Sequence, residues 1–129
     1  MIGYLLELRK ILHESTIKDF AIAKETEINI AQCVARLFIH TNHNLIQDHS
    51  KMDAVGLIVR NLTDPTVHHE LLIYEGLLAL TNISADDESL RARMLASGAW
   101  ANCKSLLTDK NLDIATAATE VIANLALSD

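Results

Sequence analysis

The sequence contains few of the residues that build tight turns and sheets. Four glycines and one proline in 129 residues are too few for the many turns of a β-sandwich or barrel. Aromatic residues make up only 4 %, whereas 50 % of the residues are hydrophobic, so the core must consist mainly of Leu, Ile and Ala. Such a core favours helix over sheet. The composition therefore predicts one all-α domain.

The sequence also lacks the usual features of secreted and membrane-spanning proteins. Its two cysteines, Cys33 and Cys103, stand in no paired motif, which predicts two reduced, buried thiols. No apolar run reaches the ~18 residues of a membrane span, and no basic region precedes the first apolar residues as in a signal peptide. The net charge of −6 argues against nucleic acid or an anionic membrane as the main partner. We therefore expect a cytoplasmic protein.

Apolar residues recur at helical spacing along most of the chain. The stretch 70–84 is apolar on most of its circumference, which predicts a long buried helix. The clearest break is 63–66, because Pro65 disfavours helix at the residue before it. Gly98 suits a left-handed helix end, and Thr26 is a candidate break inside another long helix. The predicted helices cover about 2–14, 17–40, 45–50, 51–62, 70–84, 89–96, 100–107 and 112–127.

The end of the predicted long buried helix is repeated elsewhere in the chain. Residues 79–84 (ALTNIS) resemble 121–126 (VIANLA), and a weaker copy lies at 35–40 (ARLFIH). In these copies, Asn82 and Asn124 are 42 positions apart. A helix that recurs every ~40–47 residues is typical of armadillo and HEAT repeats. This predicts an armadillo-like right-handed superhelical solenoid of about three repeats, with units at about 1–40, 45–84 and 88–127.

Residues 1–129 are then a single armadillo-repeat domain or a section of a longer solenoid. A complete solenoid ends in capping repeats with a polar outer face, and neither end of this sequence has that composition.

Two of the copies carry a closer resemblance. The stretches 75–84 (EGLLALTNIS) and 117–125 (AATEVIANL) look like the third helix of an armadillo repeat. Together with the Gly-Ala loop between them, they resemble the UCS-domain family of myosin chaperones. The resemblance is strongest over 70–127 and covers 1–69 only by repeat architecture. Phe38 departs from it, because the other two copies have Asn at this place.

The resemblance implies a solenoid that binds the myosin motor domain and assists its folding. We therefore expect a non-catalytic protein-binding module, with the myosin motor domain as its partner and a heat-shock co-chaperone as a further partner of the full-length family member. Neither nucleic acid nor a membrane is expected as a partner. The alternative is a generic armadillo-repeat adaptor, which binds a folded partner without chaperone activity.

The candidate site residues lie on the predicted long helices. An Asn in an apolar helix must satisfy its amide, so Asn82 and Asn124 either bond to a neighbouring helix or line a groove and clamp an extended partner. Glu75, Glu120 and Leu78 share this surface, and the two carboxylates either suit a basic partner or are simply solvated. The predicted partner-binding groove is thus Asn82, Asn124, Glu75, Glu120 and Leu78.

Other chemistry-bearing residues receive plainer interpretations. The histidines at 40, 43, 49, 68 and 69 lack a further ligand at fixed spacing, so neither a metal nor another cofactor is expected. Trp100 is expected to anchor packing between repeats, rather than to face a partner. No phosphate-binding loop, nucleophile elbow, or Ser or Cys beside a base is recognisable. The sequence therefore predicts a protein that is not an enzyme, with a helical enzyme or metal protein as the remaining alternative.

Overall fold

The chain forms a packed all-α structure, as the composition predicts. The computed structural model describes residues 2–15, 20–41, 46–64, 69–85 and 87–127, apart from the side chains of 11–15 and 20–23. Within these ranges every regular element is an α-helix. The helices are α1 (Ile2–Ser15), α2 (Phe20–His40), α3 (Asp48–Leu62), α4 (Glu70–Ser84), α5 (Glu88–Ala96), α6 (Ala99–Leu106) and α7 (Leu112–Leu125).

Polar residues and one glycine determine where the last three helices begin. α5 starts after Asp87, whose carboxylate accepts the Leu90 N–H at 3.2 Å. α7 starts after Asn111, whose Oδ1 accepts the Asp113 N–H at 3.0 Å. Side chains of this kind satisfy N–H groups that have no partner inside the helix. Gly98 separates α5 from α6 at φ 91°, in the left-handed region that glycine enters without a steric penalty.

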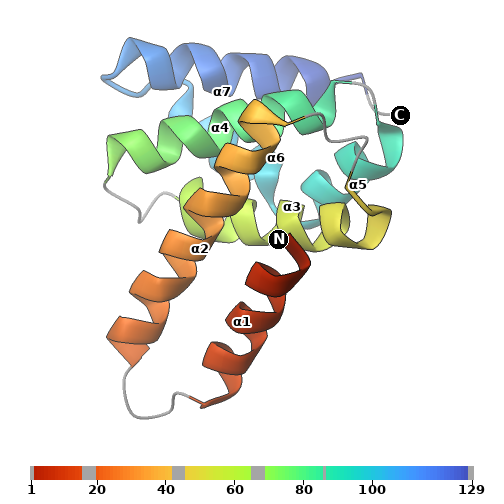
Figure 1. Cartoon of the computed structure of the whole chain (residues 1–129). Helices are drawn as coiled ribbons and strands as arrows, with labels where there is room; N and C mark the ends of the chain where they lie inside the picture. The colour runs from red at the N-terminus through yellow and green to blue at the C-terminus, as the bar shows by residue number, and fades with distance from the viewer. Residues whose placement is uncertain (1, 16–19, 42–45, 65–68, 86, 128–129) are drawn as a thin grey trace.

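The three long helices α2, α4 and α7 pack in that order, with α4 between the other two. In Figure 1, α7 and α4 run side by side across the top, and α1 and α2 form a hairpin that projects downward. α3 packs against α1, α2, α4 and α5, while α6 packs against α7. Neighbours thus cover α4 on several sides, which explains why 70–84 is apolar on most of its circumference.

The hydrophobic core lies between these packed helices. At one point α3 and α4 approach closely, because a Cβ placed on Gly76 would lie 2.7 Å from the Cβ of Leu62. Glycine at this position therefore permits the two helices to pack as they do. The largest fully buried side chains are Val34, Phe38, Leu57, Ile58, Leu62, Leu77, Leu80, Ile83, Leu90, Met94, Ile114 and Leu125.

Two predicted helix boundaries are wrong. α2 continues through Thr26, since one threonine costs a helix at most ~0.7 kcal/mol and burial of side chains such as Ala31 and Val34 outweighs that cost. α3 is a single helix from Asp48, so no separate helix ends at residue 50. The predicted break at 63–66 lies partly outside the described residues.

Cys33 and Trp100 lie on outer surfaces, contrary to the prediction that both are buried in packing. Cys33 is exposed, because α2 turns Val34 into the core instead. Trp100 is 42 % exposed, whereas Ala99 and Cys103 of the same helix are fully buried. Since successive residues of a helix point about 100° apart, Trp100 can face outward although Ala99 beside it is buried.

Candidate functional site

Asn82 lies near the C-terminal end of α4, and its side-chain amide bonds to the preceding long helix. Its Nδ2 donates to the Phe38 carbonyl oxygen at 3.2 Å. Phe38 belongs to the last turn of α2, where backbone carbonyls have no partner inside the helix. The asparagine therefore completes the end of another helix, although the residue as a whole remains exposed.

Asn124 makes the equivalent contact one helix further on. Its Nδ2 donates to the Thr81 carbonyl oxygen at 3.3 Å and to Ser84 Oγ at 3.0 Å. Both acceptors belong to the last turn of α4. Asn82 and Asn124 thus have partners within the chain, which is one of the two roles that the sequence left open. Their role in clamping a partner segment stays a prediction.

Asn102 repeats the same arrangement between α6 and α3, and sequence reasoning missed it. Its Nδ2 on α6 donates to the Val59 carbonyl oxygen and to Thr63 Oγ1, both at 3.3 Å, at the end of α3. The signal was present, because Asn102 follows Val59 by 43 positions, close to the spacing of 42 between Asn82 and Asn124.

Glu75 is buried between α4 and α2, with 7 % of its surface exposed. Arg36 donates to it twice, from Nε to Oε2 at 2.6 Å and from Nη2 to Oε1 at 3.0 Å, and Gln32 Nε2 lies 3.3 Å from Oε1. The hydrogen bond from Arg36 lowers the pKa of the Glu75 carboxyl below its usual value, and burial opposes this only in part. The carboxylate is therefore charged and already paired within the chain.

Glu120 and Leu78 have different environments. Glu120 is exposed on α7, with Thr116 one turn before it and Ala123 one turn after it also exposed. Leu78 on α4 is half-buried. α2, α4 and α7 are neighbours in space, and we name one set of their exposed and half-buried residues the long-helix face. Its members are Cys33, Arg36, His40, Leu78, Asn82, Thr116, Glu120 and Ala123.

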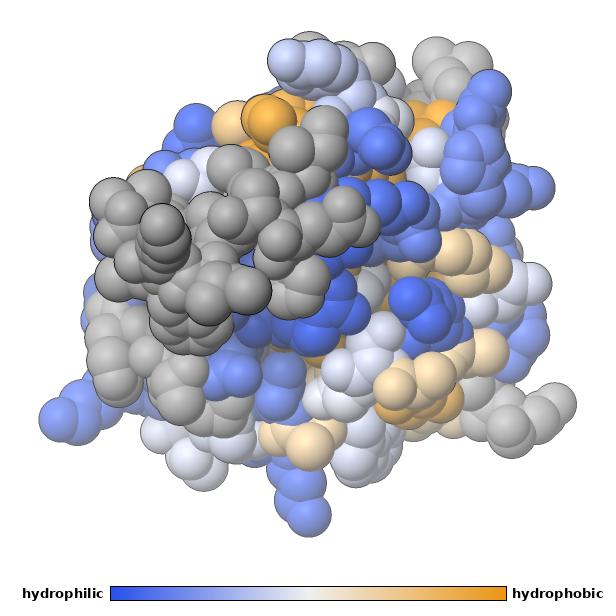
Figure 2. Space-filling model, turned by 90° about the horizontal axis from the view of Figure 1, so that it is seen from below, coloured by the Kyte–Doolittle hydropathy of each residue, from blue (hydrophilic) through white to orange (hydrophobic). Residues whose placement is uncertain are grey.

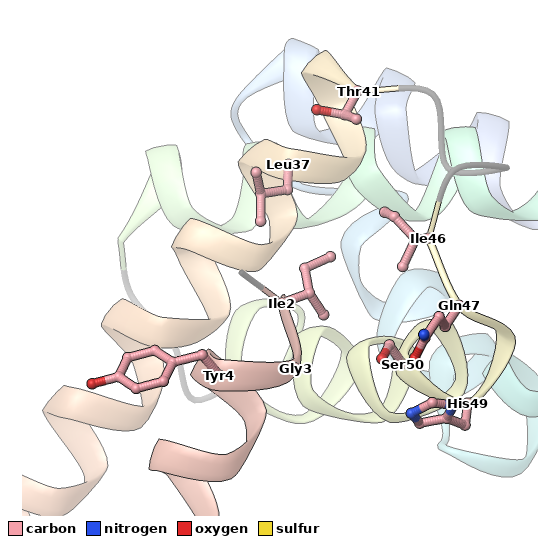
Figure 3. A pocket seen from close by; sticks show the side chains of 9 residues that line it. All are labelled: Ile2, Gly3, Tyr4, Leu37, Thr41, Ile46, Gln47, His49 and Ser50. Atoms are coloured by element: carbon pink, nitrogen blue, oxygen red, sulfur yellow. The ribbon is translucent and has the colours of Figure 1, made fainter.

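A pocket of about 470 Å³ lies away from these candidates, between α1, the end of α2 and the start of α3. In Figure 3, Ile2 points into its centre, with Leu37 and Ile46 on the opposite walls. Thr41 and Ser50 are among the polar residues that line it. None of the five predicted site residues lines it, and its walls come from three separate segments, so sequence spacing gave no signal for it.

Histidine and cysteine side chains are candidate metal ligands and nucleophiles in the part of the chain that the structure describes. No set of three His, Cys, Asp or Glu residues there could hold a metal ion. His40, His49 and His69 are exposed, while positions 43 and 68 lie outside the described residues. Burial raises the pKa of Cys103 to about 12, so this thiol is protonated at neutral pH and is a poor nucleophile.

The described helices also include none with the length and apolar character of a membrane span. A comparison with models of known protein families and with curated proteins finds no match for this chain.

Proposed function

We propose that this chain is a section of an armadillo-like solenoid that binds protein partners without catalysing a reaction. The observation that supports the solenoid is the regular spacing of hydrogen bonds between helices. The bonded positions are 44 residues apart for Asn82 and Phe38, 43 for Asn124 and Thr81, 43 for Asn102 and Val59, 41 for Arg93 and Met52, and 41 for Asn111 and Glu70. The pair Arg36 and Glu75 is 39 apart, whereas the bonds of Asn61 to Lys24 and Glu27 span 37 and 34 positions.

A separation that recurs near this size is what stacked repeats produce, because each repeat contacts mainly the next one in the sequence. Separations of 41 to 44 residues lie within the ~40–47-residue period of armadillo and HEAT repeats. The packing order of α2, α4 and α7 agrees with this interpretation, since it follows their order in the chain.

The long-helix face is the surface that we assign to the partner. It is built on helices rather than loops, and the hydrogen bonds of Asn82 and Asn124 fix the register between those helices. A rigid surface loses little conformational entropy when it binds, which favours affinity. The exposed carboxylate of Glu120 gives its α7 edge a negative charge that suits a basic segment of the partner.

Within this class of proteins, we propose a UCS-type chaperone that binds the myosin motor domain. Support comes from the segments 75–84 and 117–125, which resemble that family and which occupy the C-terminal parts of α4 and α7. The same two segments contain Asn82 and Asn124. A generic armadillo adaptor, which binds a folded partner without assisting its folding, is the alternative.

The test is binding of the purified chain to purified myosin motor domain, together with light scattering of the motor domain on heating. We compare wild type with Glu120→Arg on the long-helix face. The matched control is Glu7→Arg, an identical charge reversal at an exposed position on α1. We expect Glu120→Arg to weaken binding by roughly fivefold or more, as for loss of one interfacial charge contact, and Glu7→Arg to bind like wild type.

Each part of the proposal can fail separately. If wild type binds no motor domain, the chaperone assignment is wrong and the adaptor alternative stands. If it binds but leaves heat-induced scattering unchanged, the chain lacks chaperone activity. If both charge reversals weaken binding equally, the long-helix face is not the partner surface.

A further inference from the structure

Three arginines from helices distant in sequence meet beside α3: Arg9 on α1, Arg60 on α3 and Arg93 on α5. A Cβ placed on Gly56 would lie 3.0 Å from Arg60 Nη1 and 3.4 Å from Arg93 Nη2, so both guanidiniums lie over the same spot of α3. The charges of Arg9 and Arg93 add to burial in lowering the pKa of Arg60. We name these three residues the arginine cluster.

One carboxylate faces this concentration of positive charge. Glu27 Oε1 lies 3.7 Å from Arg9 Nη1 and accepts Asn61 Nδ2 at 3.4 Å. The Oδ1 of the same asparagine accepts Lys24 Nζ at 2.9 Å, which brings a fourth cation to the site. Among the described residues, Glu27 is the carboxylate that the structure places against these four positive groups, in a chain whose net charge is −6.

Several donors of the arginine cluster are left unused. Arg9 Nε is buried without a hydrogen-bond partner. Arg93 donates from Nε to the Met52 carbonyl oxygen at 3.3 Å, which leaves the outer nitrogens of its guanidinium for another ligand. Within the described ranges, neither an ion pair nor a hydrogen bond engages Arg60. Like charges held together repel one another, and Glu27 is paired with Arg9, so Arg60 and Arg93 suit a further bound anion.

We propose that Arg9, Arg60 and Arg93 form a binding site for a phosphorylated segment of a partner protein. A guanidinium presents its N–H groups in a planar fork that matches phosphate oxygens in pairs. A phosphoserine or phosphothreonine group carries about −1.5 to −2 charge near neutral pH, enough to offset two of the uncompensated arginines, whereas one carboxylate offsets a single arginine.

A peptide fits better than an extended polyanion. The chain as a whole is acidic, and such a chain repels a membrane surface or nucleic acid that presents many negative charges. Repulsion from distant surface charges is largely screened beyond ~8 Å at physiological salt, so one phosphate on a short segment can reach the arginine cluster. Seen from below (Figure 2), blue hydrophilic residues lie among white and orange ones over the described part of the surface. The site uses α1, α3 and α5, and it does not depend on the function proposed for the long-helix face.

The experiment measures fluorescence anisotropy with the full chain. The probe is a fluorescein-labelled mixture of short peptides, each with a central phosphoserine and varied flanking residues, and the reference is the same mixture without phosphate. The test variants are Arg60→Gln and Arg93→Gln. The matched control is Lys104→Gln, which removes one positive charge at an exposed position on α6. Thermal melts of all variants confirm that each is folded.

We expect the phosphorylated mixture to bind wild type at least about tenfold more tightly than the unphosphorylated one, since charged hydrogen bonds are the stronger kind. Arg60→Gln and Arg93→Gln should each weaken it by roughly tenfold, and Lys104→Gln by less than about twofold. Arg60→Lys keeps the positive charge but loses the planar guanidinium. Its affinity for the phosphorylated mixture should lie between those of wild type and Arg60→Gln.

Four results overturn the proposal. Equal binding of the two peptide mixtures excludes phosphate recognition. If Lys104→Gln loses as much peptide affinity as the two arginine variants, binding depends only on the overall charge of the chain. Two further measurements test the source of the anion. If inorganic phosphate displaces the labelled peptides when it is present at the same concentration as the peptides, the site binds free phosphate. If phosphatidylserine vesicles bind wild type but not Arg60→Gln, the partner is a membrane surface.

Discussion

Asn124 shows how one side chain can fix the register of two helices. Its amide donates to the Thr81 carbonyl oxygen and to Ser84 Oγ, 43 and 40 positions earlier in the chain. Asparagine is a poor residue for a helix interior, so its presence near the end of α7 needs a compensating interaction. The two hydrogen bonds provide that interaction, whether or not a partner also binds there.

We predict that Asn124→Ala lowers the free energy of unfolding by about 1 kcal/mol. Loss of the donor leaves partly buried acceptors without a partner, at a cost of ~1–3 kcal/mol, while the gain in helix propensity returns up to ~0.7 kcal/mol. The control is Thr116→Ala, at an exposed position of the same helix, which should leave stability equal or slightly raised. Urea denaturation followed by circular dichroism measures both. If Asn124→Ala is as stable as wild type, this residue does not contribute to the stability of the fold.

Glu75 gives a second prediction at this scale, on the dependence of stability on pH. Its pKa is lower in the folded chain than its usual value of 4.5, chiefly because Arg36 donates to it. A group with a depressed folded pKa stabilises the fold above its unfolded pKa, and this contribution disappears as pH falls through the folded pKa. Wild type should therefore be more stable than Glu75→Gln at neutral pH, and the difference should shrink progressively below about pH 4.5.

The measurement is urea denaturation of both proteins from neutral pH to about pH 3, within the range where the carboxyl titrates. The control repeats the comparison in an Arg36→Gln background, where the main cause of the shift is removed and the pH dependence should diminish. An unchanged difference between wild type and Glu75→Gln at every pH would show that the pairing contributes no stability.

At the scale of helices, the contact between α3 and α4 depends on a missing side chain. A Cβ on Gly76 would lie 2.7 Å from the Cβ of Leu62, an atom close to the backbone that cannot turn aside. A Cβ on Gly56 would first meet Arg60 Nη1 at 3.0 Å, the flexible end of a long side chain. Gly76 is therefore needed for the close packing of α3 and α4, whereas the space beside Gly56 is occupied by a side chain that can move.

Gly76→Ala should lower the free energy of unfolding by about 1–2 kcal/mol, because overpacking costs ~1–3 kcal/mol and exceeds the gain of up to ~1 kcal/mol from replacing glycine in a helix. Gly56→Ala is the matched comparison and should be neutral or stabilising by up to ~1 kcal/mol, since the Arg60 side chain can move. Thermal melts of the two variants decide the matter, and equal melting temperatures would contradict the close approach of α3 and α4.

Hydrophobic spacing predicted the helices well, because the pattern of buried residues decides where a helix lies. The stretch 70–84 coincides with α4, and Gly98 ends α5 in the predicted left-handed conformation. The pattern did not predict which polar residues of different helices meet. Arg36 and Glu75 are 39 positions apart, and only the packing of α2 against α4 places them together.

The candidate site was predictable to a similar extent. The spacing of Asn82 and Asn124 indicated that they occupy equivalent places, and both bond to the preceding long helix. The spacing could not reveal that Glu75 would be buried and paired. It also could not reveal the arginine cluster, because Arg9, Arg60 and Arg93 belong to three helices with no common motif. Contacts of this kind depend on the order in which helices stack, which is a property of the whole fold.

At the scale of the whole molecule, the helices differ in how many neighbours hold them. α4 packs against α2, α3, α5 and α7, whereas α1 packs chiefly against α2 and α3. Stability within a protein follows such differences, because segments with fewer buried contacts open at a lower free energy than the core. In a stacked arrangement the outermost elements should therefore open before the central one.

We predict that backbone amides of α1 exchange with solvent through a partial opening that leaves α4 intact. Native-state hydrogen exchange at low urea concentrations measures the opening free energy of each amide, and we expect the α1 values to lie at least about 1–2 kcal/mol below those of α4. The α1 values should also depend only weakly on urea, because partial opening exposes little surface. The α4 values should match the free energy of global unfolding. If the amides of both helices exchanged at that same free energy, the chain would open as one unit, and the uneven contacts of α1 and α4 would not divide its stability.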